Sequence, residues 1–183
     1  MRHPLRRLTG FVLVVLAACS RSSHEPATPS PASRTTGRTT PAASSGALSK
    51  ATSSSFADEL LLRTNAERRT AKLAPLTRSI NLARAAEMQA GQMARANLLE
   101  HDIPTAAHPT LGARLAAVQY PIRAAGENIG EGYREPAAAV TGWMASSGHR
   151  ANILSPSYTE IGAAVAQSST GTLYWVQVFG RPK

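Results

Sequence analysis

A histidine with serines and a glycine beside it lies in the stretch ASSGHRANIL, residues 145–154. Imidazole serves as a general base or as a metal ligand near neutral pH, so His149 is the first candidate for chemistry. Neither Ser146 nor Ser147 lies in the G-x-S-x-G turn of serine hydrolases. No HExxH spacing forces two histidines onto one helix face. From these residues alone, the chemistry of His149 and a purely structural role are both open.

The single cysteine, Cys19, points to lipid attachment rather than to catalysis or a disulfide. It ends the sequence Leu-Ala-Ala-Cys, which looks like the lipobox of bacterial lipoproteins. Three arginines and the apolar run Leu8–Ala18 precede it, as in a secretory signal peptide. That run is too short to span a bilayer as a helix. We therefore expect residues 1–18 to be a removed signal peptide and Cys19 to carry lipid on the extracytoplasmic side of a bacterial membrane.

Low-complexity sequence follows the cysteine and separates it from the folded part. Residues 19–55 are rich in Ser, Thr, Pro and Ala without apolar periodicity, which predicts a disordered tether. Residues 56–183 are then a single domain that folds without disulfides. The chain carries a formal charge of +9, but the leader and the tether hold most of it, and the domain keeps only +3. No cluster of basic and aromatic residues predicts nucleic-acid binding.

The domain alternates helical and strand-like patterns. The last strand has apolar residues on both faces, so it should be buried on both sides of a sheet. Helices packed on both faces of a short, mostly antiparallel sheet give an α+β, three-layer α-β-α sandwich. The segments predict helices at 56–73, 79–97, 110–120 and 135–144, and strands at 126–133, 160–167 and 172–180.

Three segments together resemble the CAP superfamily, the cysteine-rich secretory, antigen-five and pathogenesis-related proteins, in a disulfide-free bacterial form. They are TNAER at 64–68, AAGENIGEG at 124–132 and WMASSGHRANILSPSYTEIGAAVA at 143–166. The resemblance implies the same α-β-α sandwich, with a central cavity lined by two histidines and two glutamates. By motif position, His101, Glu127 and His149 match three of these cavity residues. Ser146 stands where many members have the second glutamate.

The resemblance leaves two functional hypotheses. The first is a lipid-anchored binding module at the cell envelope, whose cavity takes a lipid, a cell-wall component or a protein. The second is a divalent-metal-dependent, peptidase-like hydrolase, with zinc held by His101 and His149 and with Glu127 in the same site. Because Ser146 is a poor replacement for a carboxylate base, we favour binding, assign no catalytic residue and expect zinc to bind only weakly.

A structural role for the same residues has its own physical basis. His149, beside Gly148, could bond backbone groups where a helix ends. Arg150 could pair with Glu127 or Glu131. In that case these residues would stabilise the fold rather than form a functional site.

Overall fold

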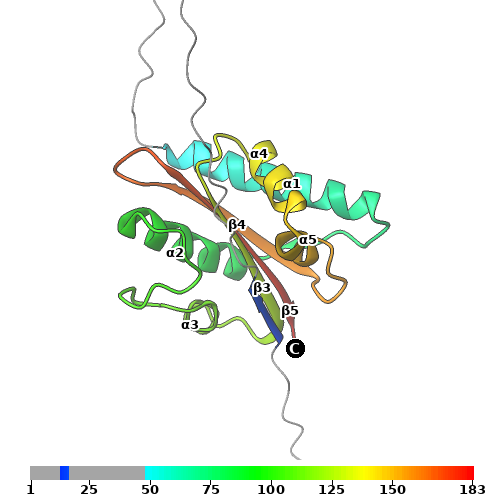
Figure 1. Cartoon of the computed structure of the whole chain (residues 1–183). Helices are drawn as coiled ribbons and strands as arrows, with labels where there is room; N and C mark the ends of the chain where they lie inside the picture. The colour runs from blue at the N-terminus through cyan, green and yellow to red at the C-terminus, as the bar shows by residue number, and fades with distance from the viewer. Residues whose placement is uncertain (1–12, 17–47) are drawn as a thin grey trace, which may run out of the picture.

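The structure is a computed structural model that describes residues 13–16 and 48–183. The rest of the predicted signal peptide, Cys19 and the predicted tether as far as residue 47 lie outside the described residues. A mixed sheet forms the middle of the molecule and helices cover both of its faces (Figure 1). The strands are β1 (Leu13–Leu16), β2 (Thr77–Arg78), β3 (Ile122–Glu131), β4 (Glu160–Gln167) and β5 (Leu173–Pro182).

The sheet has the strand order β1-β3-β5-β4-β2. Its centre is antiparallel, because β5 pairs with β3 on one side and with β4 on the other. The two short outer strands run parallel to their neighbours, β1 beside β3 and β2 beside β4. The mostly antiparallel sheet expected from the sequence is therefore present, and β3 has only the four residues of β1 on its outer side.

The helices form two layers, one on each face of the sheet. They are α1 (Lys50–Thr70), α2 (Ile80–Ala96), α3 (Leu111–Ala117), α4 (Pro136–Ala145) and α5 (Ser147–Ile153). Side chains of α2 and α3 form one apolar core against the sheet, and those of α1, α4 and α5 form the other. The layers are visible in Figure 1, where α2 and α3 lie on one side of the strands. The predicted three-layer α-β-α sandwich is confirmed.

Strand β5 contributes to both cores, as its sequence predicts. Val176 and Val178 pack with α2 and α3, whereas Trp175 and Phe179 pack with the helices of the opposite layer. Gly162 on β4 lets α2 approach the sheet closely, because a Cβ there would collide with the α2 backbone. Burial on both faces fixes the pairing register of β5, since a shift by one residue would exchange its two sets of core contacts.

Several elements differ from the sequence-based expectation, and two of the differences bear on the domain boundary and the site. Helix α1 begins at Lys50 with Ser49 as its N-cap, so residues 50–55 of the predicted tether are helical. The backbone N–H of Leu48 also donates to the side chain of Gln167, at 2.7 Å. Helix α5 was not expected, and it places His149 inside a helix rather than at a helix end. No helix among the described residues is long and apolar enough to cross a membrane.

Candidate functional site

A buried carboxylate on β3 is the centre of the candidate site. Glu127 is fully buried, and its two oxygens have different partners. Oε2 accepts a hydrogen bond from the Arg114 guanidinium at 2.8 Å, and Oε1 lies 2.9 Å from His101 Nδ1. Because an ionised carboxylate only accepts hydrogen bonds, His101 donates through Nδ1–H. The arrangement is a buried charge pair extended by an imidazole.

Arg114 is the member of this cluster that the sequence reading missed. It lies on α3, four residues after Thr110, whose side chain caps the helix by accepting from Ala113 N. The structural alternative in which Arg150 pairs with Glu127 or Glu131 does not hold for Glu127, because Arg150 is exposed and Arg114 binds the buried carboxylate. The available signal was a cation within the apolar helix sequence LGARLAA, since an arginine in such a position needs a buried acceptor.

His101 lies in the loop after α2 and is held there through its backbone. Gln89 Nε2 donates to the carbonyl oxygens of Glu100 at 2.6 Å and His101 at 3.1 Å. Both terminal nitrogens of Arg114 approach the same His101 oxygen, at 3.3 and 3.4 Å. Arg114 therefore orients both the carboxylate and the loop that carries the imidazole, and the His101 side chain is 15% exposed.

His149 comes from α5, in the opposite helix layer, and is 6% exposed. Burial lowers the pKa of His149 below its ordinary value near 6.5, and the nearby charge of His101 lowers it further. His149 is therefore neutral at physiological pH, the form that binds a metal or accepts a hydrogen bond.

Two asparagines connect β3 to α5 and fix the position of His149. Asn128 Nδ2 donates to the His149 carbonyl oxygen at 3.1 Å, and Asn152 Nδ2 donates to the Glu127 carbonyl oxygen at 3.2 Å. Asn152 also donates to Asn128 Oδ1 at 3.0 Å. Gly126 makes room for this contact, because a Cβ there would lie 2.9 Å from Asn152 Oδ1 and would clash with the Tyr158 hydroxyl. The AGEN segment of β3 therefore joins both histidines to one strand.

Neighbouring residues of a strand point to opposite faces of its sheet. The Glu127 side chain contacts His101 on the α2–α3 face, whereas Asn128 contacts α5 on the other face. His101 and His149 therefore lie on opposite faces of the sheet, and both are connected to β3, whose outer neighbour is the four-residue strand β1. The candidate site is therefore located at a sheet edge.

Arg68 secures the far end of α5. From α1, its Nη1 donates to the carbonyl oxygens of Ile153 and Ser155, both at 2.8 Å. These carbonyls lie at the helix C-terminus, where no intrahelical donor remains. Asn65, one turn earlier on α1, likewise binds backbone: its side chain donates to the Leu76 carbonyl oxygen and accepts from the Leu76 N–H.

Ser146 lies at the junction between α4 and α5 and is half-buried. Its backbone N–H donates to Trp143 O, and its carbonyl oxygen accepts from Arg150 N. Among the described hydrogen bonds, none joins the Ser146 side chain to His101, Glu127 or His149. Among the four expected cavity residues, His101 and Glu127 are in direct contact, and Ser146 lies at the junction of α4 and α5, three residues before His149.

The cluster fits zinc only in part. A histidine that donates its second ring N–H to a carboxylate is a common arrangement at metal sites, and His101 has it. Neutral His149 could supply a second nitrogen. Glu127, however, already binds Arg114 and His101, so it lies behind His101 rather than beside it as a ligand. Across residues 13–16 and 48–183, no three His, Cys, Asp or Glu residues are arranged to hold a metal ion.

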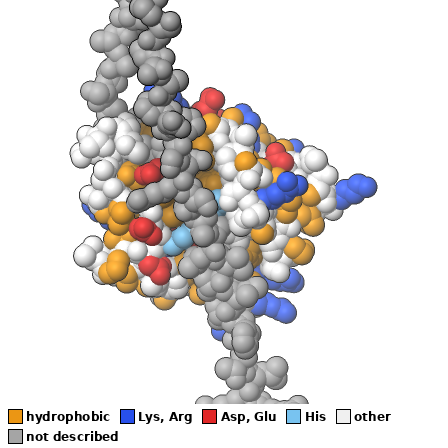
Figure 2. All heavy atoms as spheres, viewed as in Figure 1, with side chains coloured by type: hydrophobic (Ala, Val, Ile, Leu, Met, Phe, Trp, Pro, Cys, Tyr) orange, Lys and Arg blue, Asp and Glu red, His pale blue; other side chains and the backbone are white. Residues whose placement is uncertain are grey.

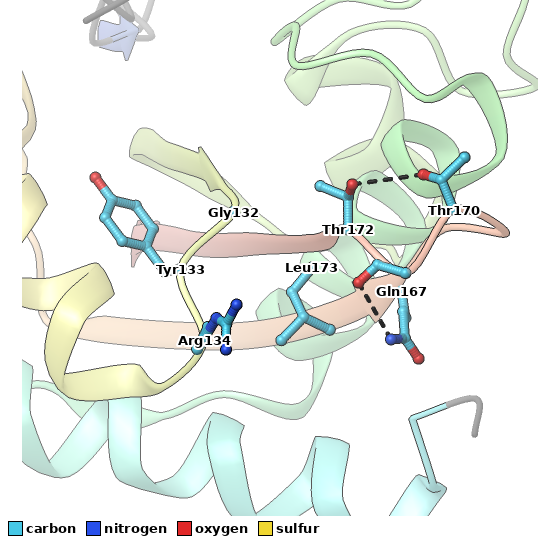
Figure 3. A pocket seen from close by; sticks show the side chains of 8 residues that line it. Gly132, Tyr133, Arg134, Gln167, Thr170, Thr172 and Leu173 are labelled. Carbon is cyan, nitrogen blue, oxygen red and sulfur yellow. Dashed lines mark hydrogen bonds between the residues drawn. The ribbon is translucent and has the colours of Figure 1, made fainter. Parts of the chain in front are cut away.

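A separate pocket of about 500 Å³ lies at the other end of β3 (Figure 3). The loop after β3 and the β4–β5 turn line it with Tyr133, Arg134, Thr170 and Leu173 among others. Its polar groups include the Gln167 side chain, which donates to Gly171 O at 3.2 Å. The pocket shares no residue with the His–Glu–Arg cluster.

Histidine surface is visible on the face shown in Figure 2, with acidic side chains beside it and basic side chains toward the opposite margin. Glu100 and Asp102, on either side of His101 in the sequence, are both exposed. Negative charge is therefore exposed immediately before and after the half-buried His101 in the chain.

These features define an α+β sandwich with a buried Glu–Arg–His cluster at the edge of its sheet. The model of the cysteine-rich secretory protein (CAP) family matches residues 61–179. The match covers most of the domain and includes all four expected cavity residues. The chain belongs to the CAP family.

Bacterial proteins are among those similar to this chain, and one of them is described as extracellular. The chain is 34% identical over 126 residues to the uncharacterized protein YkwD of Bacillus subtilis, covering 69% of this chain and 47% of that protein. An extracellular SCP-domain protein of Bacillus anthracis is 28% identical, with a TM-score of 0.65, over 74% of this chain and 45% of its own. The chain thus spans about half the length of these relatives. An outer surface protein of Borrelia burgdorferi, 18% identical with a TM-score of 0.61 over 69% of this chain and 92% of its own, shares the fold.

Proposed function

We propose that this CAP-domain protein is a lipid-anchored binding module on the extracytoplasmic side of a bacterial membrane, and that its ligand meets the protein at His101 and His149. The observation that supports binding over catalysis is the complete engagement of Glu127. Both of its oxygens are hydrogen-bonded, one to a buried guanidinium and one to an imidazole. A general base must be able to reach a substrate proton or a water, and this carboxylate is oriented inward.

The hydrolase alternative would need a carboxylate that the described cluster does not offer. Zinc, when bound by His101 and His149, would supply a water of lowered pKa. Glu127 would then orient His101 and increase its basicity, and neutral His149 would complete the pair. Zinc sites of this kind ordinarily have three protein ligands. Two imidazoles without a third ligand favour weak binding.

Zinc titration by calorimetry tests this assignment on untagged protein. We expect weak binding by the natural protein, a loss of about 10–100-fold or more in affinity for His101→Ala and for His149→Ala, and tighter binding for Ser146→Glu. Binding should also weaken as the pH falls through about 6, because both imidazoles must be neutral to bind the metal. His108→Ala is the matched control, since that half-buried loop histidine lies outside the cluster. Equal affinity in all alanine variants would refute a metal site here.

Location is tested independently through Cys19. The lipobox predicts that Cys19→Ala abolishes membrane association while leaving the thermal unfolding of the domain unchanged. Detergent phase partitioning measures the first effect and circular dichroism the second. A variant that still partitions with the membrane would contradict lipid anchoring.

A further inference from the structure

The outer edge of β3 is occupied by a short segment of the same chain. Leu13–Leu16 lie parallel to β3, with Leu13 opposite Ala124 and Leu16 opposite Glu127. A strand edge presents unpaired N–H and C=O groups, and an extended segment of polypeptide can satisfy them. The pairing shows that this edge accepts an extended segment in a defined register.

The occupying segment is part of the predicted signal peptide, residues 1–18. Leu16 is only three residues from Cys19, the predicted new N-terminus. Cleavage there removes all of β1, so the backbone of residues 124–127 loses its partner. The mature chain would then have β3 as a free edge strand next to the candidate site.

The side chains along this edge favour an apolar partner. Ala124 packs in the core formed by α1, α4 and α5, and Ala125 packs in the core formed by α2 and α3. Gly126 has no side chain and follows directly. The strand that pairs with these small residues has the apolar sequence Leu-Val-Val-Leu, and apolar, β-branched residues are enriched in strands.

The histidines flank the same edge. Glu127, the last paired residue, contacts His101 on one face, and Asn128 holds α5 with His149 on the other. An extended segment paired with residues 124–127 therefore ends opposite Glu127, whose side chain contacts His101. The cluster lies at the end of a strand-binding edge.

We infer that in the mature protein the β3 edge binds an extended, apolar peptide segment of another polypeptide, parallel to β3 and hydrogen-bonded to residues 124–127. The inference rests on the proposed binding function and names its ligand class. Affinity comes from backbone hydrogen bonds, and selectivity comes from apolar side chains packed beside Ala124 and Ala125.

The experiment uses the lipidated protein, extracted from membranes in detergent, with its N-terminus determined by mass spectrometry. The probe is a fluorescent peptide, Leu-Val-Val-Leu-Ala-Ala with two lysines added for solubility, and fluorescence anisotropy measures binding. The D-enantiomer of the probe is the control, because it enters detergent micelles equally but does not match the twist of an L-strand. We expect the L-peptide to bind at least tenfold more tightly than the D-peptide.

Two N-methylated probes then test strand pairing itself. One carries N-methyl groups on the odd-numbered backbone amides and the other on the even-numbered ones. Only alternate amides of a strand face its neighbour, so one probe should bind within about threefold of the parent and the other at least tenfold more weakly. Equal binding of both probes, equal binding of the D-peptide, or a β3-paired dimer of the protein that excludes the probe would each overturn the inference.

These outcomes are separable from a failure of the proposed function. If the probe does not bind, but the protein is membrane-bound and its histidine variants lose zinc, only the peptide inference is refuted. The proposed location and the role of the histidine cluster are then retained. Probe binding by a protein that is not membrane-associated would retain the peptide site and remove the anchor.

Discussion

Removing the cation beside Glu127 should destabilise the domain strongly. Arg114→Met keeps a helix-forming side chain of similar length on α3 but leaves a fully buried carboxylate without its guanidinium. It also removes the hydrogen bonds to the carbonyl oxygens of His101 and Pro109. Breaking a buried pair by deleting one partner costs about 3–5 kcal/mol. This is a large part of the free energy of unfolding of a whole domain, which is typically about 5–15 kcal/mol.

Urea unfolding followed by tryptophan fluorescence measures the effect. With a slope of about 1.5 kcal/mol/M, the midpoint should fall by roughly 2–3 M. Exposed Arg84→Met is the control and should shift the stability by less than about 0.5 kcal/mol. Glu127→Leu alone should cost about as much as Arg114→Met. The double variant Arg114→Met/Glu127→Leu should lose at least about 3 kcal/mol less stability than the two single losses added together. The reason is that it leaves no uncompensated charge buried. Additive effects would refute a coupled buried pair.

Three further predictions concern the histidine, the glycine and the domain boundary. Because the pKa of His149 is lowered in the folded state, the unfolded chain binds a proton at this residue first as the pH falls. The contribution of neutral His149 to stability is therefore present above about pH 6.5 and is lost at lower pH. The variant His149→Gln should lose less stability than the natural protein between about pH 7.5 and about 5, and parallel pH profiles of the two proteins would contradict this. Gly126→Val should cost about 1–3 kcal/mol in thermal unfolding because its Cβ collides with the Tyr158 hydroxyl, and an unchanged melting temperature would refute the close packing. Limited proteolysis should stop near Leu48, where the backbone is bonded, and trimming to Phe56 would contradict the early start of α1.

The sequence predicts the layers well because they depend on local pattern. The alternation through Tyr174–Phe179 indicates a strand buried on both faces, and β5 has that environment. The glycines of GENIGEG indicate close backbone packing, and Gly126 contacts Tyr158 in this way. Such signals are carried by residues adjacent in the chain, so no knowledge of the tertiary structure is needed to interpret them.

The site is less predictable because its contacts join distant segments. Helix α5 has seven residues, too few to be stable alone, and Arg68 and Asn128 hold its ends from other elements. The spacing of residues in the sequence does not identify the partner of Glu127, because a plausible fold could bring either Arg114 or Arg150 to its carboxylate. The family resemblance indicated His101, Glu127 and His149, but the inward orientation of Glu127 was visible only in the structure.

The pairing of Leu13–Leu16 with β3 has a consequence for the order of events during export. These residues belong to the apolar part of the predicted signal peptide, which the secretion machinery must recognise in an accessible form. A precursor that folded in the cytoplasm would cover that signal with its own sheet. If residues 1–18 act as the signal peptide, folding and translocation would compete for the same four residues, and slow pairing of non-local strands would favour translocation. Mutations that accelerate folding of this domain would be expected to leave more precursor behind in the cytoplasm.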